Sequence, residues 1–266
     1  METKEYSKKI KKNALELVFR KRASHIGGSL SVADILAVLF SRVAKLDPKT
    51  PKAPDRDRLF FSKGHCCSIF YACLFESGFI SKEEFEGYAD NGSRLTAHVS
   101  HKVPGVELST GSLGHAFPVA CGVALALLKR SSPARVFCIL SDGELNEGSN
   151  WEALMFAAHH QLKNICVIVD CNRIQSLGFT HDILNLEPLE QKLAAFNFDI
   201  VRIPGHHHDV LTRELAKETN RPRLIVADTV KGKGISFMEN DNIWHYKSPS
   251  ESQFEQALSE LDKEYS

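Results

Sequence analysis

The sequence predicts a doubly wound α/β fold, in which helices cover both faces of a parallel sheet. Between Val136 and Asp228, short runs that are apolar throughout alternate with segments of helical periodicity. Strands that are apolar on both sides are typical of sheets buried on both faces, and alternation with helices is typical of parallel order. We therefore expect a single domain over residues 1–266, with a helical amino-terminal segment and a carboxyl-terminal tail.

Hydrophobic periodicity places the individual elements. Residues 6–20 carry apolar side chains at helical spacing, and a second helix is expected over 32–43, where Ser31 and Asp34 have the spacing of a capping box. The other expected helices are 65–74, 119–128, 151–160, 189–196 and 210–218, and the expected strands are 136–140, 165–169, 199–203 and 224–228.

Three segments between these elements are expected to be irregular. Residues 24–30 contain Gly27 and Gly28, which favour a loop whose backbone bends or approaches a ligand closely. Residues 47–58 are rich in Pro, Lys and Asp and are expected to form a polar connector. Residues 91–114 are expected to be mostly loop, and a stretch of that length in a compact domain is commonly functional.

Composition excludes several classes of protein. Lys and Arg number 33 against 33 for Asp and Glu, so the formal charge is zero and a nucleic-acid partner is not expected. We find no apolar run near the roughly 20 residues that a bilayer span needs and no signal peptide at the amino terminus, and expect a cytoplasmic protein that does not bind membranes. The seven cysteines lie in apolar runs without C-x-x-C spacing, which indicates buried core residues.

Polar residues follow two of the expected strands where each one ends. Asp142 and Gly143 follow the strand ending at Leu140, and Asn172 follows the strand ending at Val169. If these strands are neighbours, a carboxylate and an amide meet at the sheet edge where ligands bind in this fold class, and oxygen donors of this kind suit Mg²⁺. Gly143 would leave its N–H free to approach a diphosphate. A tight turn at Asp142–Gly143 and a helix cap at Asn172 are the structural alternative.

Several ordered segments give the chain a specific resemblance. Ser141-Asp-Gly143 followed by Asn172 resembles the thiamine diphosphate motif, and the surrounding sequence resembles transketolases over nearly the whole chain. The matching segments are SHIGGSLS at 24–31, SKGH at 62–65, GSRLTAH at 92–98, PGVELSTGSLGH at 104–115, DGELNEGSNWEALMFAAHH at 142–160, NRIQ at 172–175, and VKGKGISFMEN with WH within 230–245. The resemblance is greatest to the amino-terminal subunit of a split bacterial transketolase.

The resemblance implies a cofactor site and the residues that form it. It implies thiamine diphosphate held through Mg²⁺, or through another divalent cation such as Ca²⁺ or Mn²⁺. The implied metal ligands are Asp142, Asn172 and the carbonyl of Ile174; the implied cofactor-binding residues are His65, Gly111, Leu113, Gly143, Glu147, Asn172 and His245; and the implied catalytic residues are His25, His98 and His245. Glu147 lies where the family places a carboxylate near its dimer interface.

Histidine suits the catalytic positions because imidazole donates or accepts protons near neutral pH. The run His206–His208 is interpreted differently, as a polar turn, since three consecutive side chains cannot point the same way. The chain also departs from the family pattern. Ser141 and Ala116 replace glycines, Val99 stands where Pro is common, and Tyr246 stands where Gly is usual, so Val99 and Tyr246 leave the donor sugar open.

The resemblance implies a transferase that is active only with a second subunit. It implies transfer of a two-carbon ketol unit from a ketose phosphate to an aldose phosphate, as in the pentose phosphate pathway. The Glu that activates the aminopyrimidine belongs to the second domain in this family, and no candidate for it is found in this sequence. We expect a carboxyl-terminal, pyrimidine-binding partner subunit in an α₂β₂ assembly. The alternatives are a deoxyxylulose-phosphate synthase, a 2-oxoacid dehydrogenase subunit, or a non-catalytic regulatory subunit.

Overall fold

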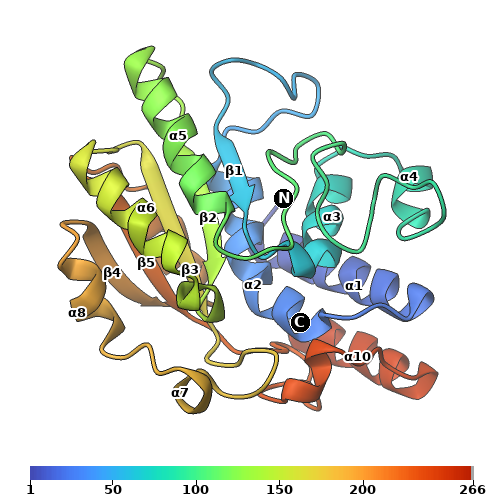
Figure 1. Ribbon diagram of the computed structural model, residues 1–266. Helices are drawn as coiled ribbons and strands as arrows, with labels where there is room; N and C mark the ends of the chain where they lie inside the picture. Colours follow the sequence, from blue (N-terminus) through green and yellow to red (C-terminus); the bar gives the residue numbers. More distant parts are fainter. Residues whose placement is uncertain (265–266) are drawn as a thin grey trace.

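A five-stranded parallel sheet forms the centre of the computed structural model, which describes residues 1–264 (Figure 1). The strand order is β1-β2-β3-β5-β4, and every neighbouring pair is parallel. The predicted fold class is therefore confirmed. The strands are β1 (Arg58–Phe61), β2 (Val136–Ser141), β3 (Ile165–Cys171), β4 (Asp199–Pro204) and β5 (Arg223–Asp228).

Helices cover both faces of this sheet. One layer includes α1 to α3, and the other includes α5 and α6 (Figure 1). The helices are α1 (Thr3–Lys21), α2 (Ile26–Val38), α3 (Cys67–Glu76), α4 (Lys82–Glu86), α5 (Ala116–Lys129), α6 (Gly148–His159), α7 (Thr180–Ile183), α8 (Leu189–Ala194), α9 (His208–Ala216) and α10 (Glu251–Glu264).

Two apolar clusters lie on opposite faces of the sheet. Along β2, Phe137 and Ile139 belong to the cluster beneath α1–α3, whereas Val136, Cys138 and Leu140 belong to the cluster beneath α5 and α6. Successive side chains of a strand point to opposite faces, so both faces of a strand that is apolar throughout need a helical cover. All seven cysteines are buried and free, as the sequence indicates.

Strand β1 was not predicted from the sequence. Its four residues pair with β2 from Arg58 opposite Val136 to Phe61 opposite Ile139. The run is short and begins with a charged residue next to the polar segment 47–58, so it lacks the length that identifies a strand. Its parallel direction carries the following residues, Ser62 to His65, to the same sheet edge as the ends of β2 and β3.

Helix α2 corrects the predicted loop over 24–30. It begins at Ile26 and contains Gly27 and Gly28, both of which are buried. The glycines serve close packing, because a Cβ at Gly28 would lie 2.9 Å from the Cys66 sulfur. Ser31 is therefore not a helix cap, and its buried hydroxyl instead donates to Asp170 on β3 at 2.6 Å.

Helix α2 also differs from the expectation that no apolar run approaches the length of a membrane span. Together with the π-helical turn Leu39–Val43, it forms a stretch from Ile26 to Val43 that is long and apolar enough to cross a membrane. Of this window 78% is buried inside the fold. Burial against α1 and α3 accounts for the apolar composition, because a helix that is hydrophobic all round is typical of a protein core.

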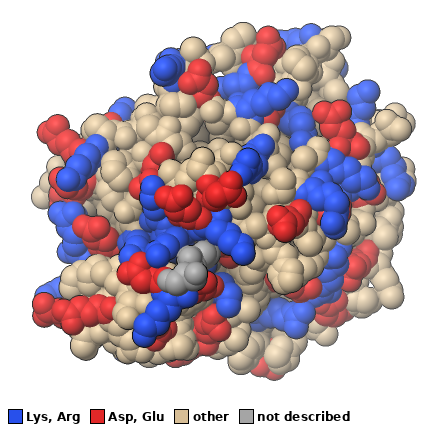
Figure 2. All heavy atoms as spheres, turned by 180° about the vertical axis from the view of Figure 1, so that it is seen from behind, with Lys and Arg blue, Asp and Glu red and all other residues tan. Residues whose placement is uncertain are grey.

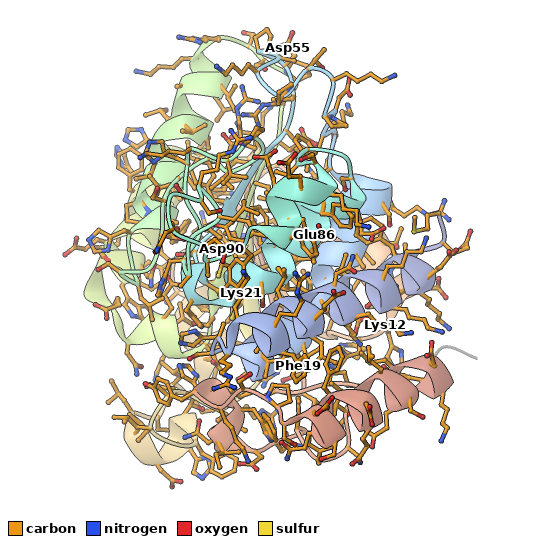
Figure 3. All side chains as sticks on the ribbon, turned by 90° about the vertical axis from the view of Figure 1, so that its right-hand side faces the viewer. Lys12, Phe19, Lys21, Asp55, Glu86 and Asp90 are labelled. Carbon is orange, nitrogen blue, oxygen red and sulfur yellow. The ribbon has the colours of Figure 1, made fainter. Side chains whose placement is uncertain are left out.

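The carboxyl-terminal tail is a helix that packs on α1. Phe19 stacks on Phe254 with ring centroids 4.2 Å apart, and Lys12 binds Asp262 at 2.7 Å (Figure 3). Ala257 and Leu261 complete the buried face of α10. On the face seen in Figure 2, acidic and basic side chains are interspersed, in keeping with the zero formal charge.

We expect truncation in the central strand to destabilise the whole fold. Ile168 is fully buried in β3, and Ile168→Ala should lower the free energy of unfolding by about 2–5 kcal/mol, because it opens a cavity between sheet and helices. Ile183→Ala is the matched control, since Ile183 is exposed and its truncation should cost at most about 0.5 kcal/mol. Denaturant unfolding measures both values, and equal losses would contradict this assignment of the core.

Candidate functional site

A cavity of about 270 Å³ lies beyond the carboxyl ends of β1, β2 and β3. This is the sheet edge at which ligands bind in open parallel folds. Every predicted site residue except Glu147 lines it. The lining residues are His25, Gly28, Lys63, His65, His98, Gly111, Leu113, Ser141, Asp142, Gly143, Asn172, Ile174, Gln175, Ser176, Lys231, His245 and Tyr246.

Strand register brings the candidate metal ligands together. Strands β2 and β3 are neighbours, with Ser141 opposite Asp170, so the residues that follow each strand converge as the sequence predicts. The Asp142 carboxylate accepts the Gly143 N–H at 2.7 Å and the Arg173 N–H at 2.5 Å. Asn172 Oδ1 accepts the Ile174 N–H at 3.1 Å. These bonds fix both side chains beside the cavity.

The donor set fits a hard divalent cation. Asp142 offers a carboxylate, Asn172 an amide oxygen, and Ile174 a main-chain carbonyl, and oxygen donors of these types are those that Mg²⁺ prefers. Each of these oxygens has a further lone pair beyond its protein hydrogen bond. Within residues 1–264 no cluster of three His, Cys, Asp or Glu side chains could hold a metal ion, so a site here depends on amide and carbonyl oxygens as well.

Burial and, second, the neighbouring Asp170 carboxylate raise the pKa of Asp142 to about 6. The two backbone N–H donors and the Lys63 ammonium act in the opposite direction. When the pKa of a carboxyl group is raised in this way, a nearby cation stabilises its charged form. The electrostatics therefore favour positive charge in front of Asp142.

A buried ion pair supports the metal motif, and sequence reasoning missed it. Asp170 and Lys63 are at most 1% exposed, and Lys63 Nζ donates to Asp170 Oδ2 and to the Gly28 carbonyl at 3.0 Å. Burial alone would lower the pKa of Lys63, but the surrounding acidic groups, chiefly the Asp170 carboxylate, together raise it. The sequence shows the segment SKGH, which contains Lys63, and the strand end that contains Asp170. It does not show that these two residues form a pair, because the pair depends on strand β1, which was not predicted.

The same carboxylate orients the Asn172 amide. Ser31 Oγ donates its hydroxyl proton to Asp170 at 2.6 Å and accepts from Asn172 Nδ2 at 3.1 Å. The Asn172 amide nitrogen therefore faces acceptors, and Oδ1 is directed to the other side, where Ile174 lies. Asp170 and Ser31 thus determine which end of the amide is available to a metal ion.

One buried donor at the cavity is unsatisfied. Gln175 Nε2 is buried and has no hydrogen-bond partner among the described residues, although Gln175 lines the cavity. An orphaned buried donor is costly, and an acceptor oxygen in the cavity would satisfy it. The backbone lies close to neighbouring side chains here, since a Cβ at Gly111 would be 2.9 Å from His98 and one at Gly143 would be 2.9 Å from Gln175.

Two predictions about this region differ from the structure. The Gly143 N–H is not free, because it donates to Asp142, although Gly143 itself lines the cavity. Glu147 is exposed and does not line the cavity. It is the N-cap residue of α6 and lies against Gly114. The 3-10 turn Gly143–Asn146 directs Glu147 away from the cavity, and the spacing of the motif does not indicate this turn.

A buried carboxylate that the sequence did not single out holds the cavity loops. Glu144 is fully buried, and it accepts the Gly114 N–H at 2.8 Å, the Ser141 N–H at 3.4 Å and the Ser62 hydroxyl. Burial raises its pKa. Glu144 therefore ties the loop that contains Gly111 and Leu113 to the ends of β1 and β2.

Four histidines from distant segments form a cluster in the cavity, as the sequence predicts. The ring of His25 lies 5.2 Å from that of His65, 6.1 Å from that of His98 and 4.9 Å from that of His245, centroid to centroid. Burial lowers the pKa of His25 to about 4 and that of His245 to about 3, with His98 and Lys231 adding to the effect on His25. At neutral pH both rings are neutral, so each presents one donor and one acceptor nitrogen.

Lys231 fixes the tautomer of His245, and sequence reasoning missed this residue. Its buried Nζ lies 3.1 Å from His245 Nδ1 and 3.2 Å from the carbonyls of Ile174 and Gln175. Because an ammonium only donates, His245 Nδ1 accepts and Nε2 carries the proton. Lys231 is the first lysine of the segment VKGKG, and it lines the cavity.

Of the two departures that bear on the substrate, only Tyr246 reaches the cavity. Tyr246 lines it, is 62% exposed, and lies 6.1 Å from the His25 ring. Val99 is 2% exposed and belongs to the apolar core. The replacement of a small residue at position 246 therefore adds a phenol ring at the open side of the histidine cluster.

Comparisons with known proteins agree with this geometry. Residues 2–261 match the family model described as transketolase, thiamine diphosphate binding domain. The chain belongs to the transketolase family. It is 43% identical, over 90% of its length and 88% of the relative's, to one subunit of the apulose-4-phosphate transketolase of Actinobacillus succinogenes. It is 38% identical, over 96% of its length and 94% of the relative's, to the SqwG subunit of the 6-deoxy-6-sulfo-D-fructose transketolase of a Clostridium species.

Solved transketolases share the fold but are longer. The transketolase of Campylobacter jejuni superposes with a TM-score of 0.93 at 30% identity, and the match covers 98% of this chain but 42% of that one. Human transketolase is 31% identical over 97% of this chain and 42% of its own length. The chain therefore spans about two fifths of the single-chain transketolases that it matches.

We expect metal binding to weaken in acid, because a proton on Asp142 competes with the ion. Below about pH 6 the affinity for Mn²⁺ should fall by about tenfold per pH unit, and above about pH 7 it should be constant. In the metal-free chain this group has a higher pKa folded than unfolded. Its contribution to folding stability is therefore lost as the pH rises from about 4 to about 6.

Electron paramagnetic resonance of Mn²⁺ without the cofactor measures this affinity, since no diphosphate then titrates. Asp142→Asn provides the control, which should bind weakly and with little dependence on pH. An affinity of the unchanged chain that is the same at about pH 5 and about pH 8 would contradict the assignment of Asp142 as a ligand.

We expect the Lys63–Asp170 pair to show strong coupling. Lys63→Met and Asp170→Asn should each cost about 3–5 kcal/mol of unfolding free energy, because each leaves a buried charge without its partner. The double variant should lose clearly less than the sum of the two single losses. The exposed pair Lys21–Asp90 (Figure 3), treated in the same way, should show a coupling below about 1 kcal/mol. Additive losses at Lys63 and Asp170 would contradict the buried pair.

Proposed function

We propose that this chain is the diphosphate-binding subunit of a split transketolase, which transfers a two-carbon ketol unit from a ketose to an aldose. The observation that carries the proposal is one cavity in which oxygen ligands, an orphaned amide donor and neutral imidazoles face one another. Membership of the family supports thiamine diphosphate as the cofactor. When bound, this cofactor supplies cleavage of a carbon–carbon bond beside a carbonyl and stores the electron pair that cleavage releases.

The residues of the chain bind and orient the cofactor and move protons. Asp142, Asn172 and Ile174 would hold Mg²⁺, which in turn binds the diphosphate. Gln175 would donate to a phosphate oxygen, which satisfies its buried Nε2. Gly111 lies on the loop that Glu144 fixes, where the aminopyrimidine is expected.

The neutral histidines are suited to the proton transfers of ketol transfer. The hydroxyl and carbonyl groups of the sugar must gain or lose protons as the bond is broken and remade. His25 and His98 are proposed to exchange these protons, because an imidazole can donate or accept a proton near neutral pH. His245 is proposed to donate from Nε2, since Lys231 holds its other nitrogen as an acceptor. His65 lies deeper and is expected to contact the cofactor.

A partner subunit is part of the proposal. Relatives of similar length are named as subunits of transketolases, and more than half of the human transketolase chain is not matched by this chain. Exposed apolar side chains next to the cavity and on α5 and α6 support a large apolar interface with a pyrimidine-binding chain, in an α₂β₂ assembly that supplies the activating Glu. These exposed side chains are Leu177, Phe179, Ile183, Leu184, Val119, Met155 and Phe156.

The donor sugar is proposed to be a specialised ketose phosphate or a related acid. The relatives of similar length are named for apulose 4-phosphate and for 6-deoxy-6-sulfo-D-fructose, so the pentose phosphate pathway has no particular support among them. Tyr246 adds a hydroxyl and a ring face at the open side of the cavity, where the sugar would enter. Reaction in the cytoplasm remains part of the proposal, because sugar phosphates are cytoplasmic metabolites.

We expect the isolated chain to be folded and inactive, because the activating Glu is supplied in trans. Ketol transfer should appear when the chain is mixed with a pyrimidine-binding subunit encoded beside it, and a coupled assay of the aldose product measures it. Asp142→Ala in the same mixture should abolish transfer and metal-dependent binding of thiamine diphosphate. Robust turnover by the chain alone would refute the half-site proposal, whereas cofactor binding without transfer in the mixture would favour a regulatory subunit.

We expect His25→Ala and His98→Ala to lose turnover while cofactor affinity changes little. Removing either ring should lower kcat by about 10²–10⁴-fold, which is the usual contribution of a general acid or base. Calorimetry should find the affinity for thiamine diphosphate within about threefold of the unchanged chain. His101→Ala is the matched control, since His101 is exposed and outside the cavity lining. Wild-type turnover in both variants would remove these residues from the mechanism.

A further inference from the structure

A buried polar cluster outside the cavity lining is centred on Asp34 of α2. Asp34 is 3% exposed, and its carboxylate lies 2.7 Å from His206 Nδ1 and 3.2 Å from His208 Nε2. The sequence predicted a polar turn for His206–His208. A turn is present at Gly205 and His206, but His208 begins α9, and both outer histidines point inward to the same carboxylate. Burial would raise the pKa of Asp34, but Lys11 and the two histidines lower it well below its usual value, so the carboxylate stays ionised.

His206 connects this cluster to the backbone of another segment. Its Nε2 accepts the Val230 N–H at 2.8 Å. An imidazole nitrogen that accepts carries no proton, so Nδ1 is the protonated nitrogen and donates to Asp34. The hydrogen bonds therefore fix both the ring orientation and the tautomer of His206. Within residues 1–264, His208 shares the contact with Asp34 but has no hydrogen bond to Val230.

The segment that His206 holds leads directly into the cavity. Lys231 follows Val230 and reaches His245 Nδ1 and the Ile174 carbonyl. On either side of these two residues the backbone is tied elsewhere, since the Gly232 N–H donates to the Gly27 carbonyl at 2.9 Å and the Thr229 N–H to the Cys171 carbonyl at 3.2 Å. A shift of the Val230 amide would therefore move the Lys231 stem relative to His245.

We propose that His206 is a positioning residue, which acts through Val230 and Lys231 to keep His245 in its Nε2–H form. The expected effect of His206 on turnover rests on the ketol transfer proposed above. The tautomer of His245 does not depend on that reaction. Asp34 serves as the anchor of His206, and α2 carries Asp34 on the same helix that begins beside His25 and packs Gly28 against the cavity.

The geometry makes a specific set of variants informative. His206→Leu removes the acceptor of the Val230 N–H and the contact with Asp34. His206→Gln keeps a side-chain oxygen that can accept from Val230. His208→Leu removes a contact with the same Asp34 carboxylate but leaves the Val230 bond intact, so it serves as the matched control for loss of stability in the cluster.

The first measurement is ¹⁵N–¹H NMR of the histidine rings in the cofactor-free chain, with the His245 signals assigned through His245→Gln. The unchanged chain and His208→Leu should show His245 with a protonated Nε2 and an unprotonated Nδ1. His206→Leu should show a mixture of tautomers, and His206→Gln should restore the signals of the unchanged chain. An unchanged His245 in His206→Leu would overturn the proposal, whether or not the chain transfers ketol units.

The second measurement is steady-state turnover of the chain assembled with its partner subunit. His206→Leu should lower kcat by about tenfold or more with a change in KM below about threefold, because the misplaced group acts in the reaction step. His206→Gln should recover most of the lost kcat. An equal loss of kcat in His208→Leu would also overturn the proposal, since the loss would then report the stability of the cluster. Absence of turnover in the unchanged assembly would refute the proposed function and leave the NMR result to decide the positioning role.

Discussion

The buried ion pair between Lys63 and Asp170 is the interaction on which the site depends. It joins Lys63, two residues beyond the edge strand β1, to the end of the central strand β3, and both charges are buried. The ammonium offsets the repulsion between Asp170 and Asp142, and the carboxylate sets the orientation of the Asn172 amide through Ser31. A buried charge pair at the edge of the cavity thus sets the orientation of the candidate metal ligands.

Much of the fold and of the site could be predicted because the informative signals are local. The apolar runs of β2 and β3 identify buried parallel strands, and parallel neighbours necessarily bring Asp142 and Asn172 to the same edge. The four histidines were found through their motifs. Glu147 was placed in the cofactor set on motif position alone, and the turn between it and Asp142 carries it outside the cavity.

What the sequence could not predict depends on tertiary contacts. Gly27 and Gly28 have low helix propensity and were interpreted as a loop, yet close packing against Cys66 and Lys231 makes glycine the residue that fits inside α2. Strand β1 is too short to show a recognisable pattern in the sequence, and it forms because it pairs with β2. Lys63, Asp170, Glu144 and Lys231 are charged residues whose burial no local pattern indicates, and they become recognisable as supports of the site only when their partners are in place.

Helix α2 carries three of the contacts that build the site and its surroundings. His25 stands at its start, Ser31 reaches Asp170 from its middle, and Asp34 holds His206 from the next turn. Because successive residues of a helix are rotated by about 100°, the number of residues between Ser31 and Asp34 fixes the directions of their side chains relative to each other. A one-residue insertion between Ser31 and Asp34 would leave every side chain chemically intact and still turn Asp34 away from His206. The spacing along this helix is therefore as much a determinant of the site as the residues that line it.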